Sequence, residues 1–229
     1  MPNSNSFPDA GPGAYGVYPA TGLLHRTYAL LAATLLFSTV TAVVGMHSPF
    51  AYQHPFLIII AAFISLFAIQ WTGMRNSPMA VPLVFLFTGL MGLSLGPAIA
   101  VYLRLPNGPA IVAEALLGTA VIFGSLSVYA LVSRRNFSYM GGFLMTGLII
   151  VVLASIANIF LHMAMLQLVV AGMALLVFSG LVLFDTSRLI HGGQTNPVLL
   201  AVSLYLDVLN IFIALLEILG ALQGGGRRR

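Results

Sequence analysis

Long apolar segments separated by short polar breaks run along most of the chain. Each segment is about 20 residues long, the length at which a helix crosses a hydrocarbon core of about 30 Å. The segments lie at residues 23–45, 54–73, 80–103, 110–132, 139–161, 164–187 and 198–220. Their apolar residues are continuous and do not alternate with polar ones, which favours helices over the strands of a membrane barrel. The pattern therefore predicts an all-α polytopic membrane protein with seven transmembrane helices.

The composition agrees with that prediction and excludes several other classes of protein. Only 6% of the residues are charged and 59% are hydrophobic, whereas a soluble domain carries about 25% charged residues. The absence of cysteine excludes disulfides, thiolate metal sites and a cysteine nucleophile. All nine basic residues are arginine, so a retinal Schiff base and a phosphate-loop lysine are excluded as well. The net charge of +4 bears on membrane orientation, and no nucleic-acid partner is expected.

The two ends of the chain differ in composition from the apolar region between them. Residues 1–22 are rich in Pro, Gly, Ser and Asn, which predicts a flexible N-terminal tail. They lack the basic start and apolar core of a secretory signal. Residues 222–229 form a Gly/Arg tail. The membrane domain is therefore expected to cover residues 23–221.

The arginines indicate which way the chain is oriented in the membrane. With the N-terminus in the cytoplasm, five arginines fall on the cytoplasmic side and Arg104 alone faces outward, as the positive-inside rule favours. The five are Arg26, Arg75, Arg134, Arg135 and Arg188. Seven crossings would place the arginines of residues 227–229 outside, which conflicts with the same rule. Either the last segment crosses and leaves the C-terminus outside, or it re-enters the membrane without crossing.

The last apolar segment carries a row of small and polar residues along one helical face. Their spacings of four, three, four and three place Ser203, Asp207, Asn210, Ala214 and Glu217 on one side of a helix. Lipid cannot satisfy polar groups, so this side should face protein or water and the helix should be central. Hydrogen bonding between helices would also explain Ser203 and Asn210, and Glu217 is near enough to the helix end to reach the interface. Asp207 is different, because an ionisable group at this depth costs about 2.5–3.5 kcal/mol and is by default a functional candidate.

Asp185 near the end of the preceding segment is the natural partner of Asp207. The two segments run antiparallel on either side of the HGGQTN loop, which places both aspartates at similar depth. Two carboxyls within hydrogen-bond reach in a low-dielectric site cannot both ionise easily, so such a pair shares one proton. When both are ionised, their oxygens are suited to Ca²⁺. A surface ion pair between Asp185 and Arg188, or a cap, is the simpler alternative.

The segments FDTSRLIHGGQTN and SLYLDVLNIFIALLEILG closely resemble the C-terminal signature of the Bax inhibitor-1 family, also called the transmembrane BAX inhibitor motif family. The loop IHGGQTN, with ANIFL and LGPAI, is most similar to the bacterial YccA-like branch. The resemblance covers residues 23–221. It implies a seven-helix fold with the last helix central, in a bacterial inner membrane with the N-terminus in the cytoplasm.

The resemblance also implies a function, namely a pH-sensitive calcium leak. Asp185 and Asp207 would be the pH sensor and gate and would ligate Ca²⁺ transiently. Arg75 is the nearest match to the arginine that acts as a latch in calcium-leak members, displaced by one residue. Ser203, Asn210 and Glu217 would line or support the path. Ca²⁺ and protons would be the species that interact with the protein, and no cofactor is expected.

Two other functions stay open. The YccA-like branch is associated with binding and restraining a membrane-bound AAA+ protease, so this chain is either a leak, a protease modulator or both. An intramembrane aspartyl protease would also use one aspartate on each of two adjacent helices. Such proteases carry a G-x-G-D motif where this chain has SLYLDVL. The chain is therefore interpreted as a membrane protein that is not an enzyme.

Overall fold

A computed structural model describes residues 20–75, 77–191 and 196–224. Within these ranges the regular structure is entirely helical and no strand occurs. The helices are α1 (Ala20–His47), α2 (Pro49–Gln53), α3 (Pro55–Met74), α4 (Ala80–Leu103), α5 (Gly108–Ser133), the 3₁₀ helix η1 (Ser138–Met140), α6 (Gly141–Leu161), α7 (Ala164–Ile190) and α8 (Pro197–Gly224). Seven of them are long and apolar enough to cross a membrane. The predicted all-α polytopic membrane fold is confirmed.

The helix ends lie within a few residues of the predicted segments. Helix α1 begins at Ala20, inside the range predicted as a tail. Residues 1–19 and 225–229 of the two predicted tails lie outside the described residues. Helix α8 is continuous over 28 residues, which is about 42 Å at 1.5 Å per residue. That length favours a full crossing over a re-entrant segment.

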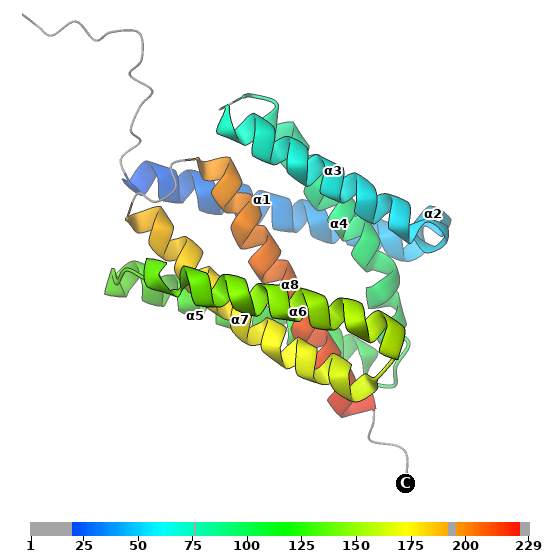
Figure 1. The fold of residues 1–229 in the computed structure, drawn as a ribbon. Helices are drawn as coiled ribbons and strands as arrows, with labels where there is room; N and C mark the ends of the chain where they lie inside the picture. Colours follow the sequence, from blue (N-terminus) through cyan, green and yellow to red (C-terminus); the bar gives the residue numbers. More distant parts are fainter. Residues whose placement is uncertain (1–19, 76, 192–195, 225–229) are drawn as a thin grey trace, which may run out of the picture.

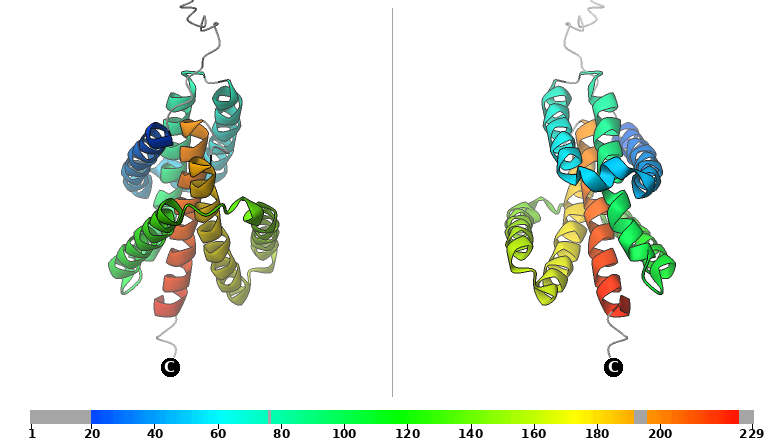
Figure 2. Two further views of the ribbon diagram at one scale, coloured as in Figure 1. Left: turned by 90° about the vertical axis from the view of Figure 1, so that its left-hand side faces the viewer. Right: turned by 90° about the vertical axis from the view of Figure 1, so that its right-hand side faces the viewer.

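Helix α8 occupies the centre of the molecule. It passes between one group of helices formed by α1, α3 and α4 and a second group formed by α5, α6 and α7 (Figures 1 and 2). It packs most closely on α7, α5 and α1. In the most apolar stretch of each helix, 61% of the residues are buried in α8, against at most 33% in the other six. The expectation of a central last helix is therefore confirmed.

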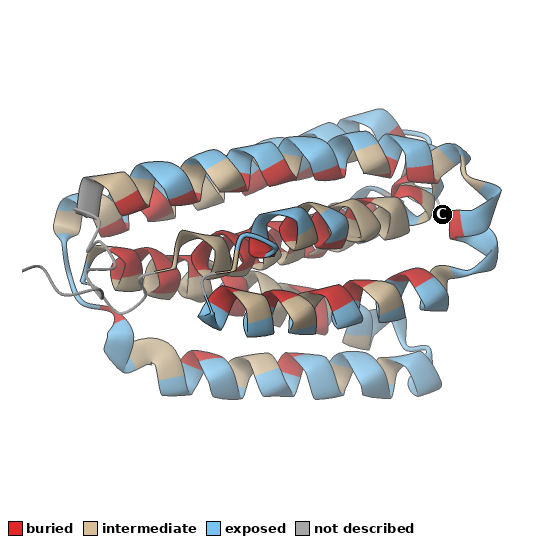
Figure 3. Ribbon diagram, turned by 90° about the horizontal axis from the view of Figure 1, so that it is seen from above, coloured by how far each residue is buried: buried red, intermediate tan, exposed pale blue. Residues whose placement is uncertain are grey.

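The outer faces of the surrounding helices are exposed and apolar. Figure 3 shows exposed residues along the outward sides of the helices and buried residues along the sides that face inward. Large side chains such as Leu36, Phe63 and Phe143 are exposed. A soluble protein rarely exposes so large an apolar surface, and lipid is the solvent that such side chains require.

Helices α1 and α4 approach each other closely because glycines face the contact. A Cβ atom on Gly92 would overlap Ser38 O and Thr41 Oγ1, and one on Gly96 would overlap the backbone at Gly45. Small residues allow this kind of approach between transmembrane helices.

Within the described residues, the two ends of the molecule differ in charge. Successive long helices run in opposite directions (Figure 1), so α1, α4, α6 and α8 begin at one end and α3, α5 and α7 finish there. We call it the arginine end, because five of the six described arginines lie there: Arg26, Arg75, Arg134, Arg135 and Arg188. The opposite end, which we call the glutamate end, carries Glu114, Glu217 and Arg104.

Candidate functional site

Asp185 lies on α7, about a turn and a half from the arginine end of that helix. It is only 3% exposed. Ser203 of α8 donates a hydrogen bond from its hydroxyl to Asp185 Oδ2. Arg188 Nη1 lies 4.0 Å from Asp185 Oδ1. The structure thus combines the expected ion pair with Arg188 and a direct link from Asp185 to the polar face of α8.

Asp207 lies on α8 one turn deeper in the molecule than Ser203 and is also 3% exposed. Its Oδ2 atom is buried and has no hydrogen-bond partner among the described residues. The carboxyl is close enough to Asp185 for a charge–charge interaction between them. The structure therefore places Asp185 at the level of Ser203 on the facing helix, with Asp207 one turn deeper. No direct hydrogen bond joins the two carboxyls within the described part of the chain.

The beginning of α8 is fixed by Asn196, the residue just before Pro197. Its side-chain oxygen accepts hydrogen bonds from the backbone N–H of Val198 at 2.8 Å and of Leu199 at 3.4 Å, as an N-terminal cap does. Its amide nitrogen donates to Gly73 O at 2.7 Å. Asn196 therefore caps α8 and ties it to the end of α3. The start of the helix that carries Asp207 is fixed by this contact.

The end of α7 is fixed by contacts with the loop that connects α5 and α6. Ser187 Oγ accepts a hydrogen bond from Phe137 N at 2.9 Å and donates to Arg135 O at 3.2 Å. His191 Nε2 lies 3.1 Å from Arg134 O. These contacts begin two residues beyond Asp185, so they determine the position of its helix at the arginine end. The sequence did not single out Ser187, because nothing in its neighbourhood distinguishes it from a surface serine.

Arg75, the expected latch, does not meet the aspartates. Its guanidinium lies over the ring of Trp71, with Cζ 4.6 Å from the ring centroid. Among the described residues no ion pair joins Arg75 to either aspartate. The reason is the position of α3, which packs mainly on α4 and meets α8 only slightly. The latch role of Arg75 stays a prediction that would require α3 to move.

The remaining polar groups of α8 have different surroundings. Asn210 donates a hydrogen bond to Leu206 O of its own helix at 2.8 Å and is half-buried. Tyr205, which no sequence pattern distinguishes from the apolar residues around it, is fully buried, and its hydroxyl shares a 2.7 Å hydrogen bond with Ser38 Oγ of α1. The same hydroxyl lies 3.4 Å from Thr88 O of α4. Tyr205 therefore connects the central helix to two others, whereas Asn210 does not.

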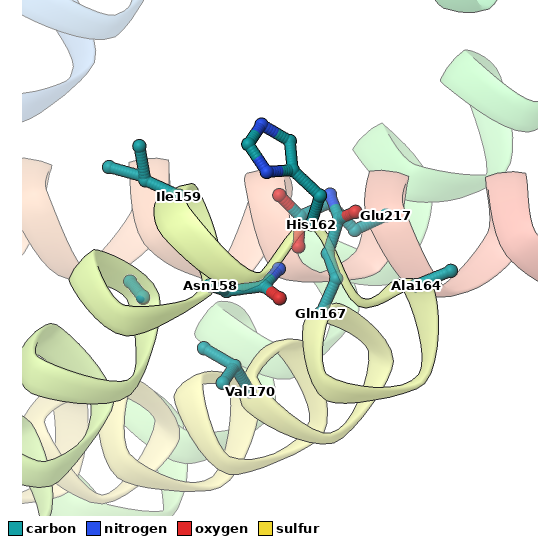
Figure 4. Close-up of a pocket in the computed structure, with 8 residues that line it drawn as sticks. Asn158, Ile159, His162, Ala164, Gln167, Val170 and Glu217 are labelled. Atoms are coloured by element: carbon teal, nitrogen blue, oxygen red, sulfur yellow. The ribbon is translucent and has the colours of Figure 1, made fainter.

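Glu217 belongs to a separate site at the glutamate end. It is half-buried and lines one cavity together with the side chain of Gln167. Its carboxyl lines a cavity of about 410 Å³ between the ends of α6, α7 and α8 (Figure 4). The other lining residues are Ser155, Asn158, Ile159, His162, Ala164, Gln167 and Val170. Glu217 is therefore not simply extended toward the membrane surface.

Clusters of metal-ligating side chains are absent from the described residues. No group of three or more His, Asp or Glu side chains in the described ranges could hold an ion. A Ca²⁺ ion at Asp185 and Asp207 would have two carboxylates and would take its other oxygen ligands from water or from Ser203, since Ca²⁺ takes 6–8 oxygen ligands. Such a site suits transient contact better than storage.

The sequence profile of the family described as "Inhibitor of apoptosis-promoting Bax1" matches residues 20–224. The chain belongs to the Bax inhibitor-1 family. The match includes all seven long helices and both aspartates, and the resemblance expected from the C-terminal motifs is confirmed.

Individual relatives are similar along nearly their whole length. A protein from Escherichia coli K12 named "Modulator of FtsH protease YccA" is 39% identical over 198 residues, which are 86% of this chain and 89% of the relative. A counterpart in E. coli O6:H1 with the same identity and coverage is named "Inner membrane protein YccA". An uncharacterised membrane protein of Vibrio cholerae is 40% identical over 201 residues, which are 88% and 90% of the two chains. The similarity to the YccA-like branch is therefore confirmed.

Proposed function

We propose that this Bax inhibitor-1 family membrane protein is a calcium leak gated by the protonation of Asp185 and Asp207. The observation that carries the proposal is the buried Asp207 carboxyl, whose Oδ2 has no partner among the described residues and which lies near Asp185. A buried ionisable group without a partner is costly for a membrane helix, and function is the usual reason for retaining one. The choice of Ca²⁺ rests on the family resemblance.

The gate would work through the number of protons on the pair. With one proton on the pair, the two carboxyls carry a single negative charge, which Arg188 and Ser203 are placed to stabilise at Asp185. Loss of that proton leaves two like charges close together in a low-dielectric site, where their repulsion is strong. The two helices then relieve the repulsion by moving apart or by admitting a cation between the carboxylates. Flux would therefore depend on pH, and the dependence would require both carboxyls.

Calcium flux into proteoliposomes, followed with an enclosed calcium dye across a range of pH, tests the proposal. The wild type is expected to leak Ca²⁺ at a rate that changes with pH. Asp207→Asn and Asp185→Asn should each abolish the pH dependence. Glu114→Gln is the matched control, because Glu114 is an exposed acid at the opposite end of the molecule, bonded to Gln223 at 2.8 Å. Unchanged flux and unchanged pH dependence in Asp207→Asn would contradict the gate.

A second function is favoured by the relative named as a modulator of the FtsH protease. We propose that this chain also binds a membrane-bound AAA+ protease, with the predicted N-terminal tail as the segment presented to it. The two functions are compatible, because the aspartate pair is buried and the tail is a separate part of the sequence. The name of the second E. coli relative supports the inner membrane as the location.

Co-purification tests this second function. The full chain is expected to retain the protease in detergent extracts of the inner membrane, and a chain lacking residues 2–20 should lose it. The Asp207→Asn variant is the control, since it alters the pair and leaves the tail intact. Equal retention with and without the tail would exclude the tail as the binding segment. That the chain is not an enzyme stays a prediction.

A further inference from the structure

Five of the eight residues that line the cavity at the glutamate end are polar: Ser155, Asn158, His162, Gln167 and Glu217. The cavity volume is about 410 Å³, which is the space of about fourteen water molecules at about 30 Å³ each. Residues from three helices converge on it: Asn158 and His162 at the end of α6, Gln167 near the start of α7, and Glu217 on α8 (Figure 4). No arginine of the described residues lines it. The cavity is therefore roomy enough for water and carries one acidic group.

The hydrogen bonds around the cavity leave acceptor atoms available. The amide nitrogen of Gln167 is the group that can donate to the Glu217 carboxylate, so the amide oxygen of Gln167 stays available. His162 Nδ1 lies 3.1 Å from Phe160 O, to which it donates, and in the neutral ring this leaves Nε2 as an acceptor. Ser155 Oγ donates to Val151 O at 2.8 Å. Asn158 Oδ1 accepts from Met163 N at 3.1 Å, so Asn158 offers its amide N–H groups to the cavity. The Glu217 carboxylate, Gln167 and His162 offer one negative charge and acceptors, which suit a ligand that presents positive charge and donors.

The lining is unsuited to a cation that has lost its water. Glu217 is the only carboxyl there, and no cluster of three or more His, Asp or Glu side chains occurs among the described residues. Ca²⁺ takes 6–8 oxygen ligands, and waters filling that shell would occupy about 180–240 Å³ at about 30 Å³ each. The cavity volume of about 410 Å³ exceeds this. A cation can therefore fit with its water shell complete.

The cavity lies on the same face of α8 as the aspartate pair. Glu217 is ten residues beyond Asp207, or about 15 Å along the helix. Asn210 and Ala214 lie between them on the polar face. A cation bound at Glu217 therefore lies at one end of the polar face of α8, and Asp207 lies further along the same face.

We propose that this cavity binds a hydrated divalent cation through Glu217, with Gln167 and His162 contacting its water shell. The cavity is the entrance from the glutamate end to the path that passes the aspartate pair. The entrance role rests on the proposed leak, whereas the binding of a cation at Glu217 does not.

Calcium binding to the purified chain in detergent micelles, measured by flow dialysis with ⁴⁵Ca²⁺, tests the proposal. The measurement uses the Asp185→Asn/Asp207→Asn double variant, so that any remaining site is separate from the pair. Glu217→Gln in that background is expected to weaken binding about tenfold, as loss of a charge near a hydrated cation implies. Glu114→Gln, which removes an exposed charge at the same end of the molecule, should change binding less than about twofold. Glu217→Asp retains the charge and should retain most of the affinity.

Each result has a distinct meaning. Equal weakening in Glu217→Gln and Glu114→Gln would reduce the effect to general surface charge and overturn the site. Absence of Ca²⁺ binding in the double variant would also overturn it. If the wild type shows no calcium flux but Glu217-dependent binding persists, the leak is wrong and the cation site stands. If flux depends on Asp207 but Glu217→Gln leaves binding intact, the cavity proposal is wrong and the leak stands. Melting temperatures of the variants, compared with that of the wild type, verify that they fold.

Discussion

At the scale of single residues, the hydrogen bond from Ser203 to Asp185 is the most informative contact of the candidate site. Ser203 is the only α8 side chain with a hydrogen bond to Asp185 among the described residues, and Asp185 is almost completely buried. Ser203→Ala leaves Asp185 Oδ2 without that donor. We expect the free energy of unfolding to fall by about 1–2 kcal/mol, because an unsatisfied buried charged acceptor is costly. Thermal unfolding in detergent measures the change.

The control for that variant is Ser125→Ala. Ser125 is exposed and bonds Ile122 O of its own helix at 3.0 Å, so its loss should shift the unfolding midpoint little. If the two alanine variants unfold at the same temperature, the hydrogen bond from Ser203 to Asp185 contributes nothing measurable.

The sequence predicted some residues of the site better than others. Asp207 was predictable from the spacing of polar residues on its helix, because that spacing alone places it away from lipid. The residue that contacts Asp185 was not predictable from the sequence. The antiparallel connection gives only an approximate depth for Asp185, and the structure places Ser203 at that depth. Asp207 lies one turn deeper. The surroundings of Arg75 depend on which helix α3 packs against, and no local pattern encodes that choice.

At the scale of helices, the contact between α1 and α4 depends on glycine. We expect Gly96→Ala to lower the free energy of unfolding by about 2 kcal/mol or more, because the added Cβ would overlap the α1 backbone at Gly45 and Met46. Backbone atoms cannot yield as a flexible side chain does.

Gly124→Ala on α5 is the matched control, because a Cβ there meets nothing within 4 Å. We expect Gly124→Ala to raise the free energy of unfolding by up to about 1 kcal/mol, because Ala favours the helix over Gly by that amount. Equal melting temperatures for the two variants would contradict the close approach.

A second prediction at this scale concerns the link between α8 and α1. Tyr205→Phe removes the hydroxyl that shares a 2.7 Å hydrogen bond with Ser38, and we expect a loss of about 1 kcal/mol. Ser38→Ala should cost a similar amount. The double variant should cost clearly less than the sum, because both single changes remove the same bond. Thermal unfolding of the four proteins gives the coupling energy, and strictly additive losses would mean that the two hydroxyls act independently.

The existence of the helices was predictable from sequence, but their partners were not. Apolar runs of about 20 residues fix the number of crossings, since the thickness of the hydrocarbon core sets the length. Packing of α1 on α4 depends on glycines of both helices meeting at one level, and a single sequence does not encode that register. The cavity beside Glu217 arises in the same way, from the arrangement of three helix ends.

At the scale of the whole molecule, the uneven distribution of arginine predicts how the chain is oriented in the membrane. Five arginines lie at the arginine end, whereas Arg104 is the single described one at the glutamate end. The positive-inside rule predicts that the arginine end lies in the cytoplasm, and the cavity at Glu217 is then expected to open to the outside. The proposed leak then has its cation entrance on the outer side and its aspartate pair toward the cytoplasm.

Cysteine labelling in sealed, right-side-out vesicles tests this orientation. The chain contains no cysteine, so a single introduced thiol is the only target for a maleimide. Asn107→Cys lies in the exposed connection between α4 and α5 at the glutamate end, and Ser138→Cys lies in the exposed connection between α5 and α6. A membrane-impermeant maleimide should label residue 107 in sealed vesicles and residue 138 only after permeabilisation.

The arginines of residues 227–229 provide the sharpest control for this experiment. If the C-terminus lies outside, these three arginines are on the side that the positive-inside rule disfavours. Replacing all three with glutamine should leave the labelling pattern unchanged if the five arginines of the arginine end determine orientation, since short loops between helices dominate that choice. Labelling of residue 138 without permeabilisation would reverse the orientation and place the Glu217 cavity in the cytoplasm. The aspartate pair would then lie toward the outside, and the pH of that compartment would control the gate.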